Sequence, residues 1–320
     1  MLPYVAGRLL QAVPLVLGIL VLSFVLIHAA PGDPIYALAG NSGDAAYYAA
    51  MRAKFGLDRP VAEQLAIYLA NALHGDFGYS YTHSAPVFSV ITDRVPATLL
   101  LMLPALALST AAGVCLGAQA AAHADRPADR AITACTLLGA ALPAFWLGQI
   151  LVIVFAIGLG LFPVQGMTAA RGAPRGLQAV LDLLHHLVLP VLTLSALQLT
   201  LVTRLTRAGV RETLVEDYIR TGRAKGLSTG QVLVRHALPN ALLPVVTLVG
   251  GQFGTLLTGA VLTEIIFAWP GLGRLLYDAT LARDYPLLMG IFLVASLSVI
   301  AANLAVDLLY GWLDPRVRVR

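Results

Sequence analysis

The sequence predicts an all-α membrane protein with six transmembrane helices. The first observation is composition: of 320 residues, 58% are hydrophobic and only 12% are charged. A soluble domain carries roughly 25% charged residues, so an ordinary soluble enzyme is excluded, as are disordered and collagen-like chains. The second is a mean hydropathy of +0.79. The third is a series of six uncharged stretches, most of them near the length of about 20 residues that crosses the hydrocarbon core of a bilayer.

The six stretches can be assigned in chain order. They cover residues 9–30, 97–122, 131–170, 187–203, 237–263 and 286–306. The first is longer than the roughly 7–15 apolar residues of a signal peptide, which favours a retained helix although residues 27–30 resemble a cleavage site. The third is too long for one helix, and we expect it to end at Pro163 and Gly166. Four prolines inside the stretches predict kinks: Pro104, Pro143, Pro190 and Pro244.

Basic residues predict the orientation. An even number of spans places both termini on one side, and with cytoplasmic termini 13 of the 21 Lys and Arg residues fall in inner segments. The inner segments hold fewer residues in total than the outer segments but carry more of the basic residues. This is the distribution that the positive-inside rule describes. We therefore expect a multi-pass membrane protein with both termini in the cytoplasm. The two cysteines, Cys115 and Cys135, lie in apolar stretches and imply no disulfide or metal site.

Two long connections lie on opposite sides. The outer one, residues 31–96, is predicted to form a small ordered domain, with Asp58 capping a helix that has Pro60 in its first turn, and a turn at 75–78. The inner one, residues 204–238, carries seven of the 21 basic residues.

Capping signals predict two short helices in the inner connection. Thr213 and Glu216 fit a capping box that would start a helix at about Leu214, and Ser228 and Gln231 fit a second box. Gly226 between them is expected in a left-handed conformation that ends the first helix and redirects the chain. From these features alone, a solvated loop attracted to anionic lipid headgroups by its arginines is an alternative to a docking element.

The inner connection also resembles a known loop. Arg220-Thr221-Gly222, then Gly226, then Leu238-Pro239 match the EAA---G---------I-LP loop of binding-protein-dependent ABC importer permeases, and residues 217–228 are similar to the version in the dipeptide/oligopeptide branch. Arg220, Gly222 and His236 depart from the motif. Further similarity to the B-type permease of that branch lies at residues 31–34, 55–60, 75–78, 264–273 and 283–286.

This resemblance implies an organisation and a site. Residues 1–30 would hold the N-terminus and first helix, 31–96 the extracytoplasmic domain, 97–312 the ABC permease core, and 313–320 a cytoplasmic tail. The inner connection would carry the coupling helix that rests on an ATPase subunit. Its expected contact residues are Glu216, Asp217, Tyr218, Arg220, Thr221, Gly222, Arg223, Ala224, Lys225, Gly226, Leu227 and Ser228, with Leu238 and Pro239 as the motif end.

The resemblance also implies partners. They are a paralogous permease in a heterodimer, two ATPase subunits, an extracytoplasmic substrate-binding protein and membrane lipid; nucleic acid is not expected. A phosphate-binding loop needs G-x-x-x-x-G-K-[ST], and neither Lys54 nor Lys225 follows a glycine. We therefore expect a non-catalytic chain without metal or bound cofactor, with ATP and Mg²⁺ held by the partner ATPases.

The expected cargo is a di- or oligopeptide, with haem, glutathione or a nickel chelate as alternatives within the same architecture. More distant alternatives are a passive channel, which needs no docking loop, and an intramembrane protease. The metalloprotease signature H-E-x-x-H and the aspartyl signature G-x-G-D are absent, and Asp278 of Tyr277-Asp278 is expected in an outer loop.

Polar residues on the predicted spans either line the pathway or hold helices together. They are Gln149, Gln198, Asn240, Gln252 and Asn303. His28, Glu264 and Asp307 lie near span ends, where a structural role is expected.

Overall fold

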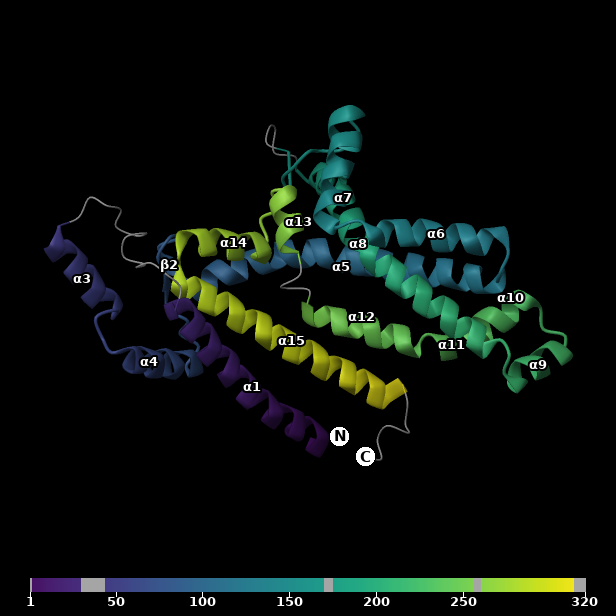
Figure 1. Ribbon diagram of the computed structural model, residues 1–320, viewed down its shortest axis with the longest axis horizontal. Helices are drawn as coiled ribbons and strands as arrows, with labels where there is room; N and C mark the ends of the chain where they lie inside the picture. The colour runs from purple at the N-terminus through teal and green to yellow at the C-terminus, as the bar shows by residue number, and fades with distance from the viewer. Residues whose placement is uncertain (1, 30–43, 170–174, 256–259, 314–320) are drawn as a thin grey trace. The chain divides into compact units, whose positions relative to one another are not determined.

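A computed structural model describes residues 2–29, 44–169, 175–255 and 260–313, which are mostly helical (Figure 1). The sequence motif at 31–34 and the tail from residue 314 lie outside the described residues, as does the side chain of Asp307. The chain divides into two compact units. Unit 1 comprises Met1–Thr98, Leu257–Val261 and Gly271–Arg320, and unit 2 comprises Leu99–Leu256 and Leu262–Pro270.

Unit 1 is a helical assembly that contains one small hairpin. Its helices are α1 (Leu2–Ala29), α3 (Ala45–Phe55), α4 (Val61–Leu73), the first part of α5 (Val87–Ala122), α14 (Leu272–Ala282) and α15 (Tyr285–Leu313). Strand β1 (Tyr79–Ser80) pairs antiparallel with β2 (Ala85–Pro86). Helices α1 and α15 lie side by side (Figure 1). Buried apolar side chains of α1, α5, α14 and α15 form its core, including Phe24, Ile91, Leu272 and Leu287.

Asp284 joins the hairpin to the start of α15. Its buried carboxylate accepts hydrogen bonds from the hydroxyls of Ser80 (2.6 Å) and Thr82 (2.8 Å) and from the backbone N–H of Thr82 (3.0 Å). It also accepts the N–H of Leu287 at 3.3 Å, as an N-cap side chain does. The segment 283–286, noted in the sequence, therefore has a structural function: it ties the hairpin to the start of α15.

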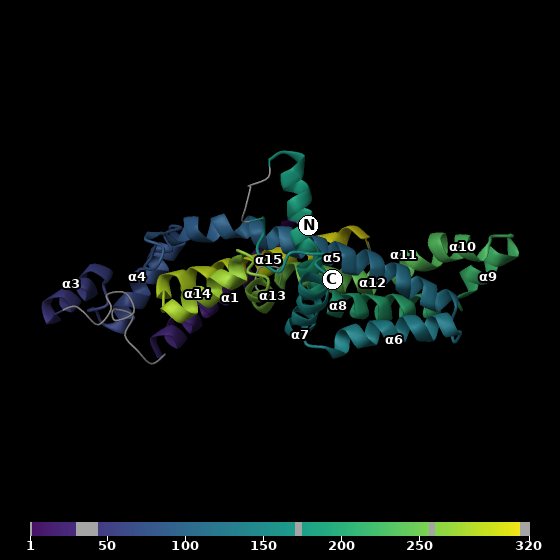
Figure 2. The same cartoon turned by 90° about the horizontal axis from the view of Figure 1, so that it is seen from above.

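Unit 2 contains the remaining helices. They are the second part of α5, α6 (Pro127–Ala141), α7 (Ala144–Leu151), a π-helix η1 (Val152–Gly158), α8 (Leu177–Thr213), α9 (Asp217–Ala224), α10 (Thr229–Val232), a π-helix η2 (Leu233–Ala237), α11 (Leu238–Ala241), α12 (Leu243–Thr255) and most of α13 (Val261–Ile266). Helices α6 and α8 lie along each other (Figure 2). Short α9 and α10 follow the end of the long α8 (Figure 1).

Within the described residues, three helices are long and apolar enough to cross a membrane. They are α5, α8 and residues 285–306 of α15; two bent helix pairs, 127–158 and 229–252, raise the number to five if each is one span. Helix α1 itself has 28 residues, and Val13–Leu22 is the apolar segment found among its fully described residues. The all-α membrane fold is therefore confirmed, whereas the number six stays a prediction.

The third apolar stretch is not a simple helix up to Pro163. The helix is broken at Leu142-Pro143, where α6 and α7 meet at an angle of 100°. The helical part of the stretch ends at Gly158, the last residue of η1. Proline lacks the backbone N–H and clashes with the preceding turn, which explains the break. Pro190, in contrast, stays inside the continuous α8, and α11 and α12 bend by 53° next to Pro244.

Some local predictions are corrected. Asp58 does not cap α4, because Pro60 occupies the N-cap position and no side chain bonds there. Asp278 lies in helix α14, which is part of the connection between the fifth and sixth predicted spans; that this connection is an outer one stays a prediction. The turn at 75–78 is confirmed, since Gly75 and Gly78 have φ of 79° and 82° and Asp76 accepts the N–H of Gly78.

Candidate functional site

The inner connection folds onto a small apolar cluster, here called the loop core. Its buried members come from α5, α8, α9, α10, η2 and α11: Ala121, Val210, Ile219, Val232, Ala237 and Ala241. Leu214, Leu227, Leu233 and Leu238 pack around them. A segment rich in charge is thus held in one conformation by apolar burial, which contradicts the picture of an ordinary solvated loop.

Helix α9 has one buried and one exposed face. Ile219 and Gly222, three residues apart and so on one face, are buried, while Tyr218, Arg220 and Arg223 are exposed. The ion pair of Arg220 with Asp217, at 3.3 Å, lies on the exposed side and is worth about 1 kcal/mol or less. The exposed face of α9 therefore places cationic side chains and a tyrosine ring on the surface of the inner connection.

The end of α9 is a Schellman motif around Gly226. The N–H of Leu227 donates to the carbonyl of Gly222 (3.3 Å), and the N–H of Gly226 donates to that of Arg223 (3.0 Å). Gly226 has φ of +84°, which confirms the predicted left-handed glycine. The next residue, Leu227, packs against the loop core. The conformation of Gly226 therefore sets the direction in which the chain leaves α9.

One of the two predicted capping boxes is present. The Ser228 hydroxyl accepts the N–H of Gln231 (3.3 Å) and the Gln231 side chain accepts the N–H of Ser228 (2.9 Å). The box at Thr213 is wrong: that hydroxyl donates to the carbonyl of Gly209 (2.8 Å) as part of α8, and α9 begins at Asp217. Glu216 occupies the N-cap position without a side-chain bond.

Residues 226–230 also spell G-x-S-x-G, a pattern that occurs around the nucleophile of serine hydrolases. A hydrolase serine needs a sharp strand-to-helix turn that exposes its hydroxyl and a histidine beside it. Ser228 instead lies between two helices, and its hydroxyl caps α10. The pattern here serves the turn, and no acyl-transfer site is formed.

The predicted pathway residues lie on four different helices. Gln149 is exposed on α7, Gln252 lies on α12, and Gln198 on α8 has a buried amide nitrogen with no hydrogen-bond partner among the described residues. Asn240 lies on α11, and its amide donates to the Tyr218 hydroxyl (3.0 Å) and to the His236 carbonyl (3.1 Å). Asn240 thus braces α9 against α11.

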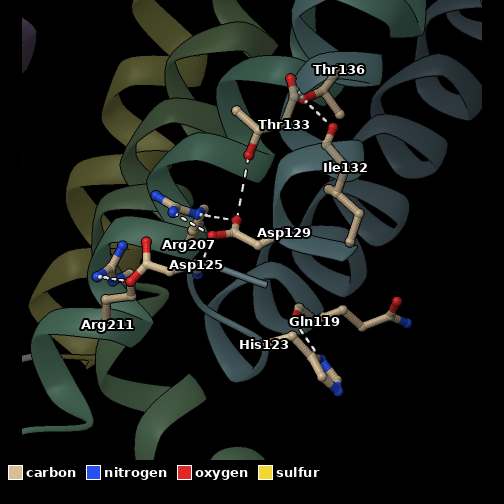
Figure 3. A network of polar contacts seen from close by, with 9 residues as sticks. All are labelled: Gln119, His123, Asp125, Asp129, Ile132, Thr133, Thr136, Arg207 and Arg211. Atoms are coloured by element: carbon tan, nitrogen blue, oxygen red, sulfur yellow. Dashed lines mark hydrogen bonds and ion pairs between the residues drawn. The ribbon is translucent and has the colours of Figure 1, made fainter. Parts of the chain in front are cut away.

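A polar network next to the loop core is a feature that the sequence did not reveal (Figure 3). Arg207 on α8 donates from Nε to Oδ1 of Asp129 (2.6 Å) and from NH2 to Oδ2 (2.7 Å). Asp129 is buried in the first turn of α6, ahead of the uncharged stretch, and also accepts the N–H of Asp125 (2.9 Å). Two hydrogen bonds to one carboxylate make this a bidentate, charge-assisted ion pair.

Close helix packing supports this network. A Cβ atom built on Gly117 of α5 would lie 2.6 Å from the carbonyl oxygen of Thr203, and one on Gly113 would lie 2.7 Å from the Val202 side chain. Small residues four apart let two helix backbones approach in this way. Helices α5, α6 and α8 are thus held together near the base of the inner connection.

Together, the apolar helices and the braced polar loop define a membrane protein with an ordered, charged connection between two of its apolar helices. Comparison with known families matches residues 1–102 to the N-terminal part of the membrane component of binding-protein-dependent transport systems, and residues 113–319 to their inner membrane component. The chain therefore belongs to this family of inner membrane components of binding-protein-dependent transport systems. The resemblance stated from the sequence is confirmed, and the chain acts as an importer permease.

Individual relatives match over the full length. The chain is 39% identical to the dipeptide transport system permease protein DppB of Escherichia coli (strain K12), with 99% of each chain covered. It is 38% identical to the oligopeptide transport system permease protein AppB of Bacillus subtilis (strain 168), again over 99% of each. It is 40% identical to the glutathione transport system permease protein GsiC of Escherichia coli (strain K12), over 100% of each.

Proposed function

We propose that this chain is the transmembrane permease of an ATP-driven importer of di- or oligopeptides and forms half of the translocation pathway. A paralogous permease supplies the other half, two ATPases bind the inner loops and hold ATP and Mg²⁺, and an extracytoplasmic protein delivers the cargo. Relatives named for dipeptide and oligopeptide transport support the cargo class. The relative named for glutathione transport is equally similar, and glutathione, itself a small peptide, stays the nearest alternative.

The observation that carries the proposal is the inner connection. Its α9 buries one face in the loop core and exposes the other, and hydrogen bonds fix both the end of α9 and the start of α10. Shifting a two-state pore from 1:99 to 99:1 takes about 5.5 kcal/mol, so force must pass through a stiff contact. We infer that residues 216–228 are the coupling element on which an ATPase rests.

The arrangement in the membrane follows from the same proposal. Six helices span a bacterial inner membrane with both termini in the cytoplasm, residues 31–96 form an extracytoplasmic domain, 97–312 the permease core and 313–320 the tail. Apolar helices and the distribution of basic residues support this arrangement.

Co-purification with its ATPases tests the proposal. The purified chain alone should hydrolyse no ATP, and a tagged chain should retain ATPase subunits expressed with it. Substituting the cationic face at Arg220 and Arg223 by serine should weaken retention, whereas serine at the exposed Arg59 of the outer segment is the matched control. ATP turnover by the isolated chain, or equal retention in both variants, would contradict the assignment.

A further inference from the structure

Helices α6 and α8 are tied together at regular intervals. The first tie is the bidentate pair of Asp129 and Arg207. Seven residues on in α6, the carbonyl of Thr136 accepts the hydroxyl of Thr200, which lies seven residues back in α8. Seven residues make about two helical turns, so both ties lie on one face of an antiparallel pair. Gly139 and Ala196 continue this register, since a Cβ on Gly139 would lie 3.9 Å from that of Ala196.

One end of the α6–α8 pair lies near the loop core, and the other end lies at a cavity. At one end, Arg207 is three residues before Val210 of the loop core. At the other end, where α6 breaks at Leu142-Pro143, a cavity of about 350 Å³ lies between the break and α8 and is lined by both helices, including Pro143 and Leu197. From Arg207 to Ala196 is eleven residues, or roughly 16 Å of helix.

The Asp129–Arg207 tie is the strong one. Both carboxylate oxygens of Asp129 are engaged, and the side chain is 3% exposed, against 28% for Arg207. Charge-assisted bidentate pairs are about twice as strong as neutral hydrogen bonds and fix orientation as well as distance. By comparison, the neighbouring pair of Arg211 and Asp125, at 3.4 Å, is 43% and 75% exposed and adds little.

We propose that Asp129 and Arg207 are positioning residues that tie α6 to α8, so that the two helices move as one lever and carry displacement of the inner loop to the cavity at the α6–α7 break. This rests on the proposed coupling role of that loop. Both residues lie outside the proposed docking segment 216–228, so loss of the pair should uncouple hydrolysis from transport while each partner still binds.

The experiment compares Asp129→Asn, which keeps the shape of the side chain, with Arg211→Gln as the matched control at the exposed pair. Both are assayed in the complete transporter in proteoliposomes. Coupling residues of this kind change coupling by about 0.5–2 kcal/mol, so we expect Asp129→Asn to raise the ATP hydrolysed per peptide imported by about 2- to 30-fold. ATPase retention should be normal, and Arg211→Gln should behave as wild type.

A distance measurement separates positioning from simple stabilisation. In a Cys115→Ala background, one spin label goes on Cys135, exposed on α6, and a second on Thr229→Cys, exposed in α10. The distance between them should be the same with and without nucleotide in the parent, and should change with nucleotide when Asp129→Asn is added. An unchanged distance in that variant, or uptake that falls only in proportion to hydrolysis, would overturn the lever. Absence of ATPase from the parent complex would instead overturn the proposed function.

Discussion

Gly226 offers the sharpest test of the inner loop, because its requirement for glycine is a backbone requirement alone. Its φ is +84°, and a Cβ built there meets no heavy atom within 4 Å. A side chain therefore creates no clash, and the cost is the left-handed backbone itself, about 1–2 kcal/mol for an ordinary L-residue. A free-energy difference of about 1.4 kcal/mol changes an equilibrium constant tenfold. The population of loops outside the native geometry should therefore rise about 5- to 30-fold.

Three substitutions isolate this effect. Gly226→Val should weaken ATPase retention and reduce uptake, whereas Gly226→Asn should be close to wild type because asparagine tolerates the left-handed conformation. Gly230→Ala is the matched control, since Gly230 also has open space around it but lies within α10 without a positive φ. Uptake and ATPase retention are measured at equal membrane abundance.

The outcome separates the coupling element from a loop held by lipid charge. If anionic headgroups hold the loop, Gly226→Val is nearly silent, and neutralising Arg220, Arg223 and Lys225 lowers uptake more. Normal uptake in Gly226→Val would refute the reasoning. Equal damage by valine and asparagine would refute the left-handed explanation.

Two further predictions follow. In a background without Cys115 and Cys135, single cysteines at Ser89 and at Thr229 should react with an impermeant reagent from opposite sides of sealed cells, and labelling of both from one side would exclude the six-span arrangement. Gly222→Ala should be tolerated and should raise the melting temperature slightly. A Cβ there makes ordinary contacts with Leu227 (3.6 Å) and His236 (4.0 Å), and alanine favours a helix by about 1 kcal/mol over glycine. A fall in melting temperature would show that the buried face of α9 has no room for the methyl group.

Much of the inner loop could be predicted because its signals are local. A left-handed glycine and a serine–glutamine capping box depend on residues within one turn, and both are present. The box at Thr213 failed because α8 continues ten residues past the uncharged stretch, held by burial of Val210 and Thr213. Burial of these later turns overrode the local signal.

The tie between Asp129 and Arg207 could not be predicted in the same way. The two residues are 78 positions apart, and each looks like an ordinary charge at the edge of an apolar stretch. Only the antiparallel register of α6 and α8 brings them together. The break at Pro143 was similar in kind: proline predicted a kink, but a 100° bend also depends on how α7 packs on α8.

Two of the three departures from the loop motif, Arg220 and Gly222, have physical reasons in the structure. Arg220 lies on the exposed face, where it pairs with Asp217 at 3.3 Å and lies outside the packing of the loop core. Gly222 stands where the motif has alanine, at a buried position that has room for the missing methyl group. Gly226, in contrast, matches the motif at the one position of the loop where the backbone itself requires glycine. The motif thus divides into a backbone requirement, which this chain meets at Gly226, and exposed positions, which under the proposed function an ATPase would contact.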